Sequence, residues 1–344
     1  MDKLTLIQPD DWHLHVRNGA ILKTVIAHTA QQFARAIIMP NLNPPVLTVD
    51  QALAYRSEII KAAPVDSGFT PLMTLYLTSS LTADEVKKAA ESEFIHAIKL
   101  YPAGATTNSD SGVSDLKGIY PILKIMEQVD IPLLIHGEVT NNDCDIFDRE
   151  KVFVASSLND IVKHFPNLRI VLEHVTTKEA VDFVLSASSK VAATITPQHL
   201  MFNRNAILAD GIRPHHYCLP IIKREHHRQT LVKAATSGNP KFFLGTDSAP
   251  HLTDAKENSC GCAGCYSAFG AMELYTDVFE QADALDKLEG FASLYGPDFY
   301  QLPRNTKSIT LQKQSWTVPA SYQVENETIT PLKANETLNW KLIK

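Results

Sequence analysis

The chain has 344 residues, of which 44% are hydrophobic and 20% are charged, and its formal net charge at pH 7 is -6. This length and composition are typical of a globular protein with a large core, and they exclude a disordered or fibrous chain. Because lysine and arginine are scattered and the overall balance is acidic, we expect no nucleic-acid partner.

Short apolar segments rich in β-forming residues alternate with longer segments that suit helices. From the N-terminus onward this pattern predicts eight strands, at residues 11–15, 36–39, 72–77, 97–101, 132–136, 169–174, 191–196 and 242–247. Helices are expected between the strands and after the last one, at residues 20–33, 49–62, 82–93, 115–129, 149–164, 177–188 and 224–237 and beyond Tyr266. The segments Thr82-Ala83-Asp84-Glu85 and Thr176-Thr177-Lys178-Glu179 each supply an N-cap hydroxyl and an acid in the first helical turn.

Eight strand and helix repeats predict an α/β fold, a (β/α)8 barrel closed on itself. The alternative is a doubly wound open sheet, but such a sheet usually has fewer strands, and no Gly-x-Gly-x-x-Gly turn follows the first strand. Beyond about Arg304 polar and apolar residues alternate, which indicates strands. We therefore expect a barrel over residues 1–303 and a small strand-containing extension over residues 304–344 packed on it. Because so little chain precedes His13, the barrel is expected to begin almost at once, without an N-terminal sheet domain.

The five cysteines are an odd number in a chain that is large enough to fold without disulfides. We expect reduced thiols in a cytoplasmic protein, since the first residues lack a signal-peptide core and no stretch is long enough to span a membrane. Cys260, Cys262 and Cys265 have a spacing that suggests a zinc knuckle. Structural zinc needs four ligands, however, so we expect no metal at these thiols.

The first candidate site residues are His13 and His15. Residues two apart on a strand project from the same face, so both imidazoles are expected to point at one spot. Neutral imidazole is a common ligand for transition metals, although most His-x-His pairs bind none. The pair alone is therefore a weak indication of a metal site.

Other residues with metal-binding or acid-base chemistry stand at the ends of predicted strands. Lys99 lies in the fourth strand, and His136, His174 and Asp247 close the fifth, sixth and eighth. Active sites of (β/α)8 barrels lie at the C-terminal ends of the strands, so these side chains are expected to meet. Lys99 fits poorly, because an ammonium cannot bind a cation. It either binds substrate or is modified so that it offers oxygen ligands.

Taken together, the set resembles the binuclear metal site of the amidohydrolase superfamily, and more narrowly it resembles the compact bacterial (class II) dihydroorotases. The matching motifs run through nearly the whole barrel: Pro9-Asp10-Asp11-Trp12-His13-Leu14-His15, Met39-Pro40-Asn41-Leu42, Lys99-Leu100-Tyr101-Pro102, Ala105-Thr106-Thr107-Asn108-Ser109, His136-Gly137-Glu138, Glu173-His174, Thr196-Pro197-Gln198-His199 and Gly245-Thr246-Asp247-Ser248-Ala249-Pro250-His251.

The resemblance implies two zinc ions per subunit, bridged by N6-carboxylated Lys99. One zinc ion would be held by His13, His15 and Asp247, and the other by His136 and His174. Such a pair of metals lowers the pKa of a bound water from about 16 toward 7 and supplies hydroxide for hydrolysis of a cyclic amide. Asp247 would also act as the catalytic proton shuttle.

The same resemblance implies that a substrate carboxylate is held by Arg17, Asn41 and His251. Arg17 would share the strand face of His15 if the strand continues, and it could pair with a carboxylate bidentately. Backbone groups near Leu219 and Ala263 are expected to contact the pyrimidine ring, and His136 is also expected to contact the substrate. The polar segment that carries Thr106 and Thr107 is expected to be a mobile lid, although its composition also suits a plain connecting loop.

The implied activity is the reversible cyclisation of N-carbamoyl-L-aspartate to (S)-dihydroorotate in pyrimidine biosynthesis, and the family often forms homodimers. Three alternatives remain: another cyclic amidase such as a hydantoinase or dihydropyrimidinase, a non-catalytic relative, and a metal storage or sensor protein. Arg17 argues against an uncharged ring as substrate, and every ligand position is filled. The pairs His215-His216 and His226-His227 are expected to be solvated residues rather than ligands, and His28, His96 and His164 are expected to be structural.

Overall fold

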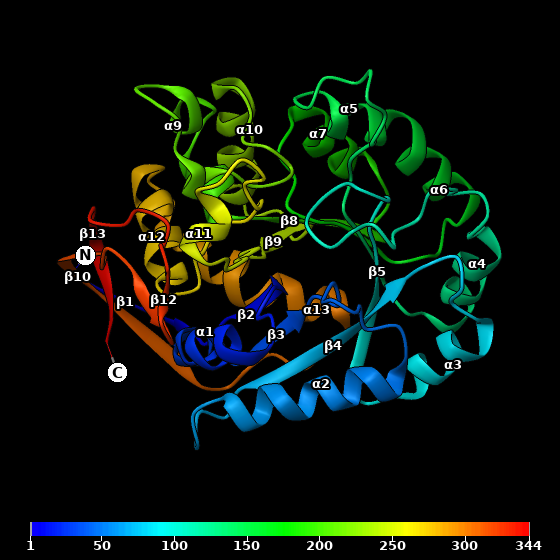
Figure 1. Ribbon diagram of the computed structural model, residues 1–344, viewed down its shortest axis with the longest axis horizontal. Coiled ribbons are helices and arrows are strands. Elements are labelled where there is room, and N and C mark those ends of the chain that lie inside the picture. Colours follow the sequence, from blue (N-terminus) through cyan, green and yellow to red (C-terminus); the bar gives the residue numbers. More distant parts are fainter. Residues whose placement is uncertain (1, 344) are drawn as a thin grey trace.

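The computed structural model describes residues 2–343, and its centre is a barrel of eight parallel strands surrounded by helices (Figure 1). The strands follow one another around the barrel in chain order: β2 (Asp10–Leu14), β3 (Arg35–Ile38), β4 (Thr70–Leu77), β5 (Ile95–Leu100), β6 (Leu133–Ile135), β7 (Ile170–Leu172), β8 (Val191–Ile195) and β9 (Phe242–Leu244). A parallel bridge between Leu14 and Ser248 joins the first strand to the last. The predicted (β/α)8 barrel is confirmed.

Helices fill the crossovers between the strands, as the sequence predicts. The α-helices are α1 (Gly19–Gln32), α2 (Val49–Ala62), α3 (Ala83–Glu91), α4 (Tyr120–Val129), α5 (Arg149–Phe153), α6 (Asn159–His164), α7 (Lys178–Ser186), α8 (Pro197–Met201), α9 (Asn205–Leu208), α10 (Glu225–Ala235), α11 (Thr253–Lys256), α12 (Ala271–Gln281) and α13 (Tyr295–Tyr300). The hydroxyls of Thr82 and Thr177 accept hydrogen bonds from the backbone N–H groups of Glu85 and Ala180, each at 3.2 Å, so both predicted N-caps are confirmed.

Two predicted helices differ in detail. The helix expected from residue 115 begins five residues later, at Tyr120, where Pro121 occupies its first turn; proline is favoured there because its missing N–H is not needed. The helix expected over 149–164 contains a π-helical turn at Val154–Leu158 between α5 and α6. The hydrophobic pattern predicts the positions of both helices, but it does not predict the later start of the first or the π-helical turn in the second.

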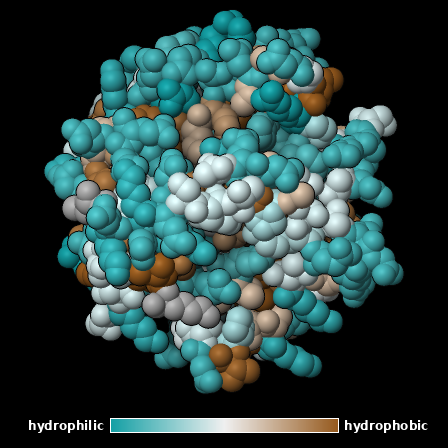
Figure 2. All heavy atoms as spheres, turned by 90° about the vertical axis from the view of Figure 1, so that its left-hand side faces the viewer, coloured by the Kyte–Doolittle hydropathy of each residue, from teal (hydrophilic) through white to brown (hydrophobic). Residues whose placement is uncertain are grey.

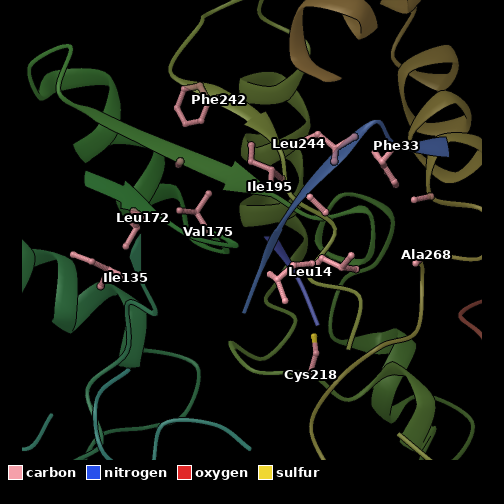
Figure 3. Close-up of a cluster of buried hydrophobic side chains, with 14 of the residues drawn as sticks. Leu14, Phe33, Ile135, Leu172, Val175, Ile195, Cys218, Phe242, Leu244 and Ala268 are labelled. Atoms are coloured by element: carbon pink, nitrogen blue, oxygen red, sulfur yellow. The ribbon is translucent and has the colours of Figure 1, made fainter. Parts of the chain in front are cut away.

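The strands bury apolar side chains on both of their faces. Outward-facing residues pack under the helices, and Figure 3 shows Ile135, Leu172, Ile195 and Leu244 on four consecutive strands of this layer. Inward-facing residues fill the barrel interior, among them Leu72, Leu134, Val171, Phe243 and Trp12. Such double burial is typical of parallel strands and explains their continuous apolar runs in the sequence.

A small antiparallel sheet lies beside the barrel, near both chain ends (Figure 1). Its central strand β10 (Ser308–Thr317) pairs with β13 (Thr337–Ile343) and with β1 (Lys3–Ile7), while β11 (Tyr322–Val324) and β12 (Glu327–Ile329) form a separate hairpin. The sequence did not predict β1, because its pairing with β10 joins residues that are about 300 positions apart. The surface of this side is mostly hydrophilic, with scattered apolar patches (Figure 2).

Among residues 2–343, none of the helices combines the length and the apolar character that crossing a membrane requires.

Glu273 on α12 provides a test of how the small sheet is attached to the barrel. The side chain is 5% exposed, and its Oε1 accepts a hydrogen bond from the backbone N–H of Leu342 on β13 at 3.1 Å. Its Oε2 is buried and has no hydrogen-bond partner among the described residues. Burial raises the pKa of this carboxyl to about 7, so ionisation opposes folding.

We expect Glu273→Gln to make the stability of the protein less sensitive to pH. An unfolded glutamate ionises near pH 4.5, so the free energy of unfolding of the wild type falls as the pH rises through about 7, and glutamine removes that loss. Between acidic and alkaline pH, the free energy of unfolding of the variant should rise by up to about 3 kcal/mol relative to that of the wild type. Urea unfolding near pH 5 and pH 8 measures the difference, and a pH-independent difference would contradict the prediction.

Candidate metal centre and substrate pocket

Three potential ligand atoms converge at the mouth of the barrel. Nε2 of His13 lies 3.3 Å from Nε2 of His15, and Oδ1 of Asp247 lies 3.3 Å and 3.2 Å from these two nitrogens. In a tetrahedral site with metal–ligand distances near 2.1 Å, neighbouring ligand atoms are about 3.4 Å apart. The triangle therefore fits one face of the coordination shell of a divalent ion such as zinc.

The seam between the first and last strands of the barrel fixes this triangle. The backbone N–H of Asp247 donates to the carbonyl of His13 at 2.9 Å, and that of His15 donates to the carbonyl of Ser248 at 3.1 Å. Gly245 is required here, because a Cβ at this position would lie 2.7 Å from Cβ of Thr194 and 3.2 Å from Cβ of His13. The close packing of the two strand ends thus places the three side chains together.

Asp11 reinforces the same seam from below the site. Its carboxylate is completely buried and accepts hydrogen bonds from the backbone N–H of His13 at 3.2 Å and of Thr246 at 2.8 Å. The hydroxyl of Thr246 donates to the same carboxylate at 2.5 Å. Asp11 therefore ties the residue before Asp247 to the backbone of His13. The sequence analysis assigned it no role.

A second group of potential ligands surrounds His174. The ring of His174 lies 4.9 Å from the rings of both His13 and His136, measured between centroids. Its Nδ1 is buried without a hydrogen-bond partner among the described residues, and its backbone has a φ of +41°. A buried imidazole with an unpartnered nitrogen, on a backbone in a sparsely populated conformation, suits a metal ligand.

Glu173 connects the two groups. Its Oε1 lies 2.9 Å from Nδ1 of His13, on the side of the ring that faces away from the triangle. A carboxylate this close behind a metal-binding histidine limits how the ring can turn, although these two atoms do not meet at hydrogen-bonding angles. The sequence analysis quoted Glu173 only as part of a motif. An acid directly before a strand-end histidine is the signal that could have assigned this role.

Lys99 is completely buried, and its Nζ contacts Oε2 of Glu173 and lies 4.6 Å from the centre of the Tyr101 ring. Burial lowers the pKa of Lys99 well below its ordinary value, which favours the neutral amine. His136 reaches the same region but is turned aside, since its Nε2 lies 2.8 Å from Oε2 of Glu138. The structure thus gathers all six predicted ligands at one end of the barrel, with His136 bonded to Glu138.

The protonation states in this cluster suit cation binding. Burial lowers the pKa of His15 to about 3 and that of His174 well below its ordinary value, so both imidazoles are neutral. Burial by itself would raise the pKa of Asp247, but His13 and His15 hold it well below the usual range. Neutral imidazoles and an ionised carboxylate are the forms that bind a metal.

A cavity of about 20 Å³ lies directly beside the triangle. Six of the residues predicted to contact a substrate or to form the lid line it: Arg17, Asn41, Thr106, Thr107, Leu219 and Ala263. His15, Asp247, Ala249 and Gly264 complete the wall, whereas the predicted His136 and His251 are not part of it. This volume holds about one water molecule, so a larger ligand can enter only if part of the wall moves.

Arg17 lines this cavity, but the backbone conformation that places it there was not predicted from the sequence. The strand ends at Leu14 instead of continuing, and the backbone of Arg17 has a φ of +58°. Its guanidinium is held by the carbonyl of Pro250 at 3.2 Å and lies 3.0 Å from Nε2 of His251. Arg17 and His251 therefore lie close together as expected, but the condition that the strand continue to Arg17 is not met.

The segment with Thr106 and Thr107 closes over the cavity through a few hydrogen bonds. Asn41 Nδ2 donates to the carbonyl of Thr107 at 3.0 Å, and Asn108 Nδ2 donates to the carbonyl of Asn41 at 3.1 Å. The Thr107 hydroxyl donates to the carbonyl of Ala263 at 3.4 Å. These hydrogen bonds join the segment to Asn41 and Ala263 on the other walls of the cavity.

The remaining histidines and cysteines lie outside this centre. None of the potential metal clusters among residues 2–343 includes a cysteine. His215 lies 2.7 Å from Glu257. The prediction that His216 is solvated is wrong: it is buried, its Nδ1 lies 2.8 Å from the Ala206 carbonyl, and it stacks on Phe202. Its burial depends on an aromatic contact 14 residues away, which the local pattern does not reveal.

Comparison with known proteins supplies independent information. No family model matches the chain. The chain is 62% identical over 343 residues to a dihydroorotase of Acaryochloris marina, and the alignment covers 100% of this chain and 99% of that protein. Dihydroorotase from Saccharomyces cerevisiae, solved in complex with 5-fluoroorotic acid, is 34% identical with a TM-score of 0.91 and covers 100% and 99% of the two chains.

Dihydroorotase from Campylobacter jejuni is similar to the same degree, with 36% identity, a TM-score of 0.91 and coverage of 99% and 98%. An L-hydantoinase from Arthrobacter aurescens has a TM-score of 0.79 at only 14% identity, which indicates a shared fold alone.

Proposed function

Because the chain belongs to the dihydroorotase family, we propose that it interconverts N-carbamoyl-L-aspartate and (S)-dihydroorotate in pyrimidine biosynthesis. The observation that carries this proposal is a single pocket lined by both Asp247 of the ligand triangle and the partly buried Arg17. A hydrolytic group thus stands beside a carboxylate-binding group. That combination suits a ring that bears a carboxylate and gives no advantage with an uncharged hydantoin or dihydropyrimidine.

Two zinc ions per subunit are part of the proposal. His13, His15 and Asp247 would hold one of them, and His136 and His174 would hold the other, with carboxylated Lys99 between them. When bound, the two ions would polarise the scissile carbonyl and lower the pKa of a water molecule towards neutrality. The convergence of the triangle and the unpartnered Nδ1 of His174 support these assignments.

The environment of Lys99 suits its carboxylation. A neutral amine can attack carbon dioxide: the nitrogen forms a bond to carbon, loses one proton, and leaves an anionic carbamate with two oxygens. Burial lowers the pKa of Lys99 and so favours the amine that this reaction needs. The new anion would replace a neutral amine next to Glu173, so positive charge from metals is needed to stabilise it.

Asp247 is the group that we assign to proton transfer. During hydrolysis of dihydroorotate it would accept a proton from the attacking water and give that proton to the ring nitrogen as the amide bond breaks. Its carboxylate lines the cavity and is ionised, as a proton acceptor must be. In the direction of ring closure the same carboxylate would remove the proton from the attacking nitrogen.

Substrate binding is assigned to other residues in and around the pocket. Arg17, Asn41 and His251 would hold the carboxylate, and backbone groups at Leu219 and Ala263 would contact the ring, with His136 nearby on the metal side. Burial, together with the charge of Arg17, lowers the pKa of His251 to about 2, so this imidazole is neutral and can donate a hydrogen bond without adding charge.

Thr106 and Thr107 are proposed to form a lid that opens for substrate and closes during the reaction. We expect Thr107→Ala to lower kcat by roughly tenfold, because the hydroxyl helps to hold the closed segment against Ala263. The zinc content should not change, since Thr107 is not among the potential ligands. Steady-state kinetics and metal analysis on the same preparation measure both quantities, and unaltered kinetics would contradict the lid.

We also propose a cytoplasmic homodimer in which residues 304–344 form an extension packed on a barrel of residues 1–303, with β1 at the start of the chain completing the sheet of the extension. Light scattering should then give a mass about twice the 38.1 kDa of one chain. A mass of one chain at micromolar concentration would contradict the homodimer.

The proposed function is tested by counting metals and comparing substrates. The purified chain should contain two zinc ions and open the ring of dihydroorotate, but not that of dihydrouracil or hydantoin. Activity confined to the uncharged rings would favour another cyclic amidase. Bound metal without turnover of any ring would favour a metal storage or sensor protein, and a chain with neither metal nor activity would favour a non-catalytic relative.

A further inference from the structure

Lys256, the last residue of α11, is a buried lysine close to the substrate pocket but outside the groups assigned above. Its side chain is 4% exposed. Its Nζ donates hydrogen bonds to the carbonyls of Tyr217 at 3.0 Å, Cys262 at 2.9 Å and Gly264 at 2.6 Å. An ammonium has three N–H donors, so all of them are used.

Carbonyl groups, rather than a carboxylate, balance the charge of this ammonium. The neighbouring acid Glu257 lies beside His215 instead. Three carbonyl oxygens take the place of water around this buried ammonium. If one of them turned away, part of the positive charge would lose its solvation, so the ammonium holds all three carbonyls in place. Lys256 therefore restrains the backbone at three points.

Those three points belong to the two segments that form one wall of the cavity. Ala263 lies between the two restrained carbonyls of Cys262 and Gly264, and Leu219 follows Tyr217 by two residues. The N–H of Gly264 also donates to the carbonyl of Tyr217 at 3.0 Å, which joins the segments to each other. One ammonium thus organises both stretches of backbone that are assigned to the substrate ring.

The backbone at Ala263 has little freedom once it is held in this way. Its carbonyl accepts hydrogen bonds from Nε2 of His251 at 3.0 Å and from the hydroxyl of Thr107 at 3.4 Å. Gly264 has a φ of +150°, and a Cβ there would lie 2.7 Å from the carbonyl oxygen of Ala249. Such a conformation is open almost only to glycine, so the segment needs an anchor to keep its path.

We propose that Lys256 is a positioning residue that fixes the backbone of Ala263 and Leu219 for recognition of the substrate ring. It acts through the carbonyls of Tyr217, Cys262 and Gly264 and does not touch the substrate. This inference rests on the proposed function, because it assigns a role within the same pocket. It adds a residue that supports ring recognition without supporting the ligand triangle.

The test is Lys256→Met, which keeps much of the apolar stem and removes the ammonium. The KM for dihydroorotate and the inhibition constant of 5-fluoroorotate should both rise about tenfold or more, because the ring-binding backbone loses its anchor. The kcat should stay within about threefold of the wild type and the zinc content should not change, since Lys256 contacts none of the proposed ligands. Lys256→Gln keeps a hydrogen-bond donor and should lie between the wild type and Lys256→Met.

Lys241→Met is the matched control. The Lys241 ammonium also donates to three carbonyls, those of Val184, Leu185 and Ala187, at 2.5 to 3.4 Å, but it lies just before β9, at the opposite end of the barrel. This variant should lose stability without a change in KM. The same loss of stability in Lys256→Met, with no change in KM or in the inhibition constant, would overturn the inference.

Two further outcomes separate this inference from the proposed function. A wild type that does not act on dihydroorotate refutes the proposed function, and the inference then fails with it. A wild type that is active, together with a Lys256→Gln variant of normal KM, refutes the inference alone. That second variant decides the question even if Lys256→Met cannot be recovered in folded form.

Discussion

Asp247→Asn is expected to lower kcat for dihydroorotate by at least about 1000-fold while the barrel stays folded. The substitution removes the proton acceptor and replaces a charged ligand oxygen by a neutral amide. Asp247 Oδ1 lies within 3.3 Å of two histidine nitrogens, so no other carboxylate can take its place without moving the strand end. The backbone of Asp247 has a φ of +44°, which asparagine also tolerates, so the substitution adds no backbone strain.

Steady-state kinetics, zinc analysis and circular dichroism on one preparation measure this effect. Asp130→Asn is a suitable control, because Asp130 also has a positive φ, +53°, but lies at the C-terminal end of α4 beside Arg169, away from the triangle. It should leave kcat within about twofold of the wild type. If Asp247→Asn retained a tenth of the wild-type kcat with both metals bound, proton transfer would have to be assigned to another group.

Arg17→Met is expected to lower kcat/KM for dihydroorotate by about 100- to 1000-fold, since bound substrate would enclose the pair of carboxylate and guanidinium, and removing one partner of an enclosed charged pair typically costs about 2–5 kcal/mol. The guanidinium lines the cavity, and its present neighbours, His251 and the carbonyl of Pro250, carry no negative charge. A substrate carboxylate would supply that charge. Without Arg17 the pocket should no longer favour a carboxylated ring over dihydrouracil.

The ratio of kcat/KM for dihydroorotate to kcat/KM for dihydrouracil measures this specificity. Arg304→Met is the control, because Arg304 pairs with Asp298 at 2.6 Å on the surface and should leave the ratio unchanged. An equal loss of activity towards both rings in Arg17→Met would mean that Arg17 only maintains the structure of the pocket.

The barrel could be predicted from the sequence because its signals are local. Each strand is a short apolar run with a turn or a helix after it, and Thr82 and Thr177 mark helix starts by their own chemistry. The site residues could be predicted for the same reason, because a histidine or an aspartate directly after an apolar run is a local signal. Such a residue has few structural uses, and active sites of these barrels lie at the strand ends. The geometry of the fold then brings His13, His15 and Asp247 together.

What the sequence did not predict depends on contacts between distant residues. β1 exists only because β10 pairs with it. Glu173 gains its role from Nδ1 of His13, and Lys256 gains its role from carbonyls up to 39 positions away. A buried acid or lysine has no periodic pattern of its own, so these supporting residues become visible only when the folded backbone supplies their partners.

The most direct test of the central claim is anomalous diffraction at the zinc edge from crystals grown with zinc and bicarbonate. We predict two anomalous peaks at the C-terminal end of the barrel, one among His13, His15 and Asp247 and the other beside His174, with density for a carbamate on Lys99. A single peak, or none at saturating zinc, with an unmodified Lys99 against Glu173, would contradict the two-metal site.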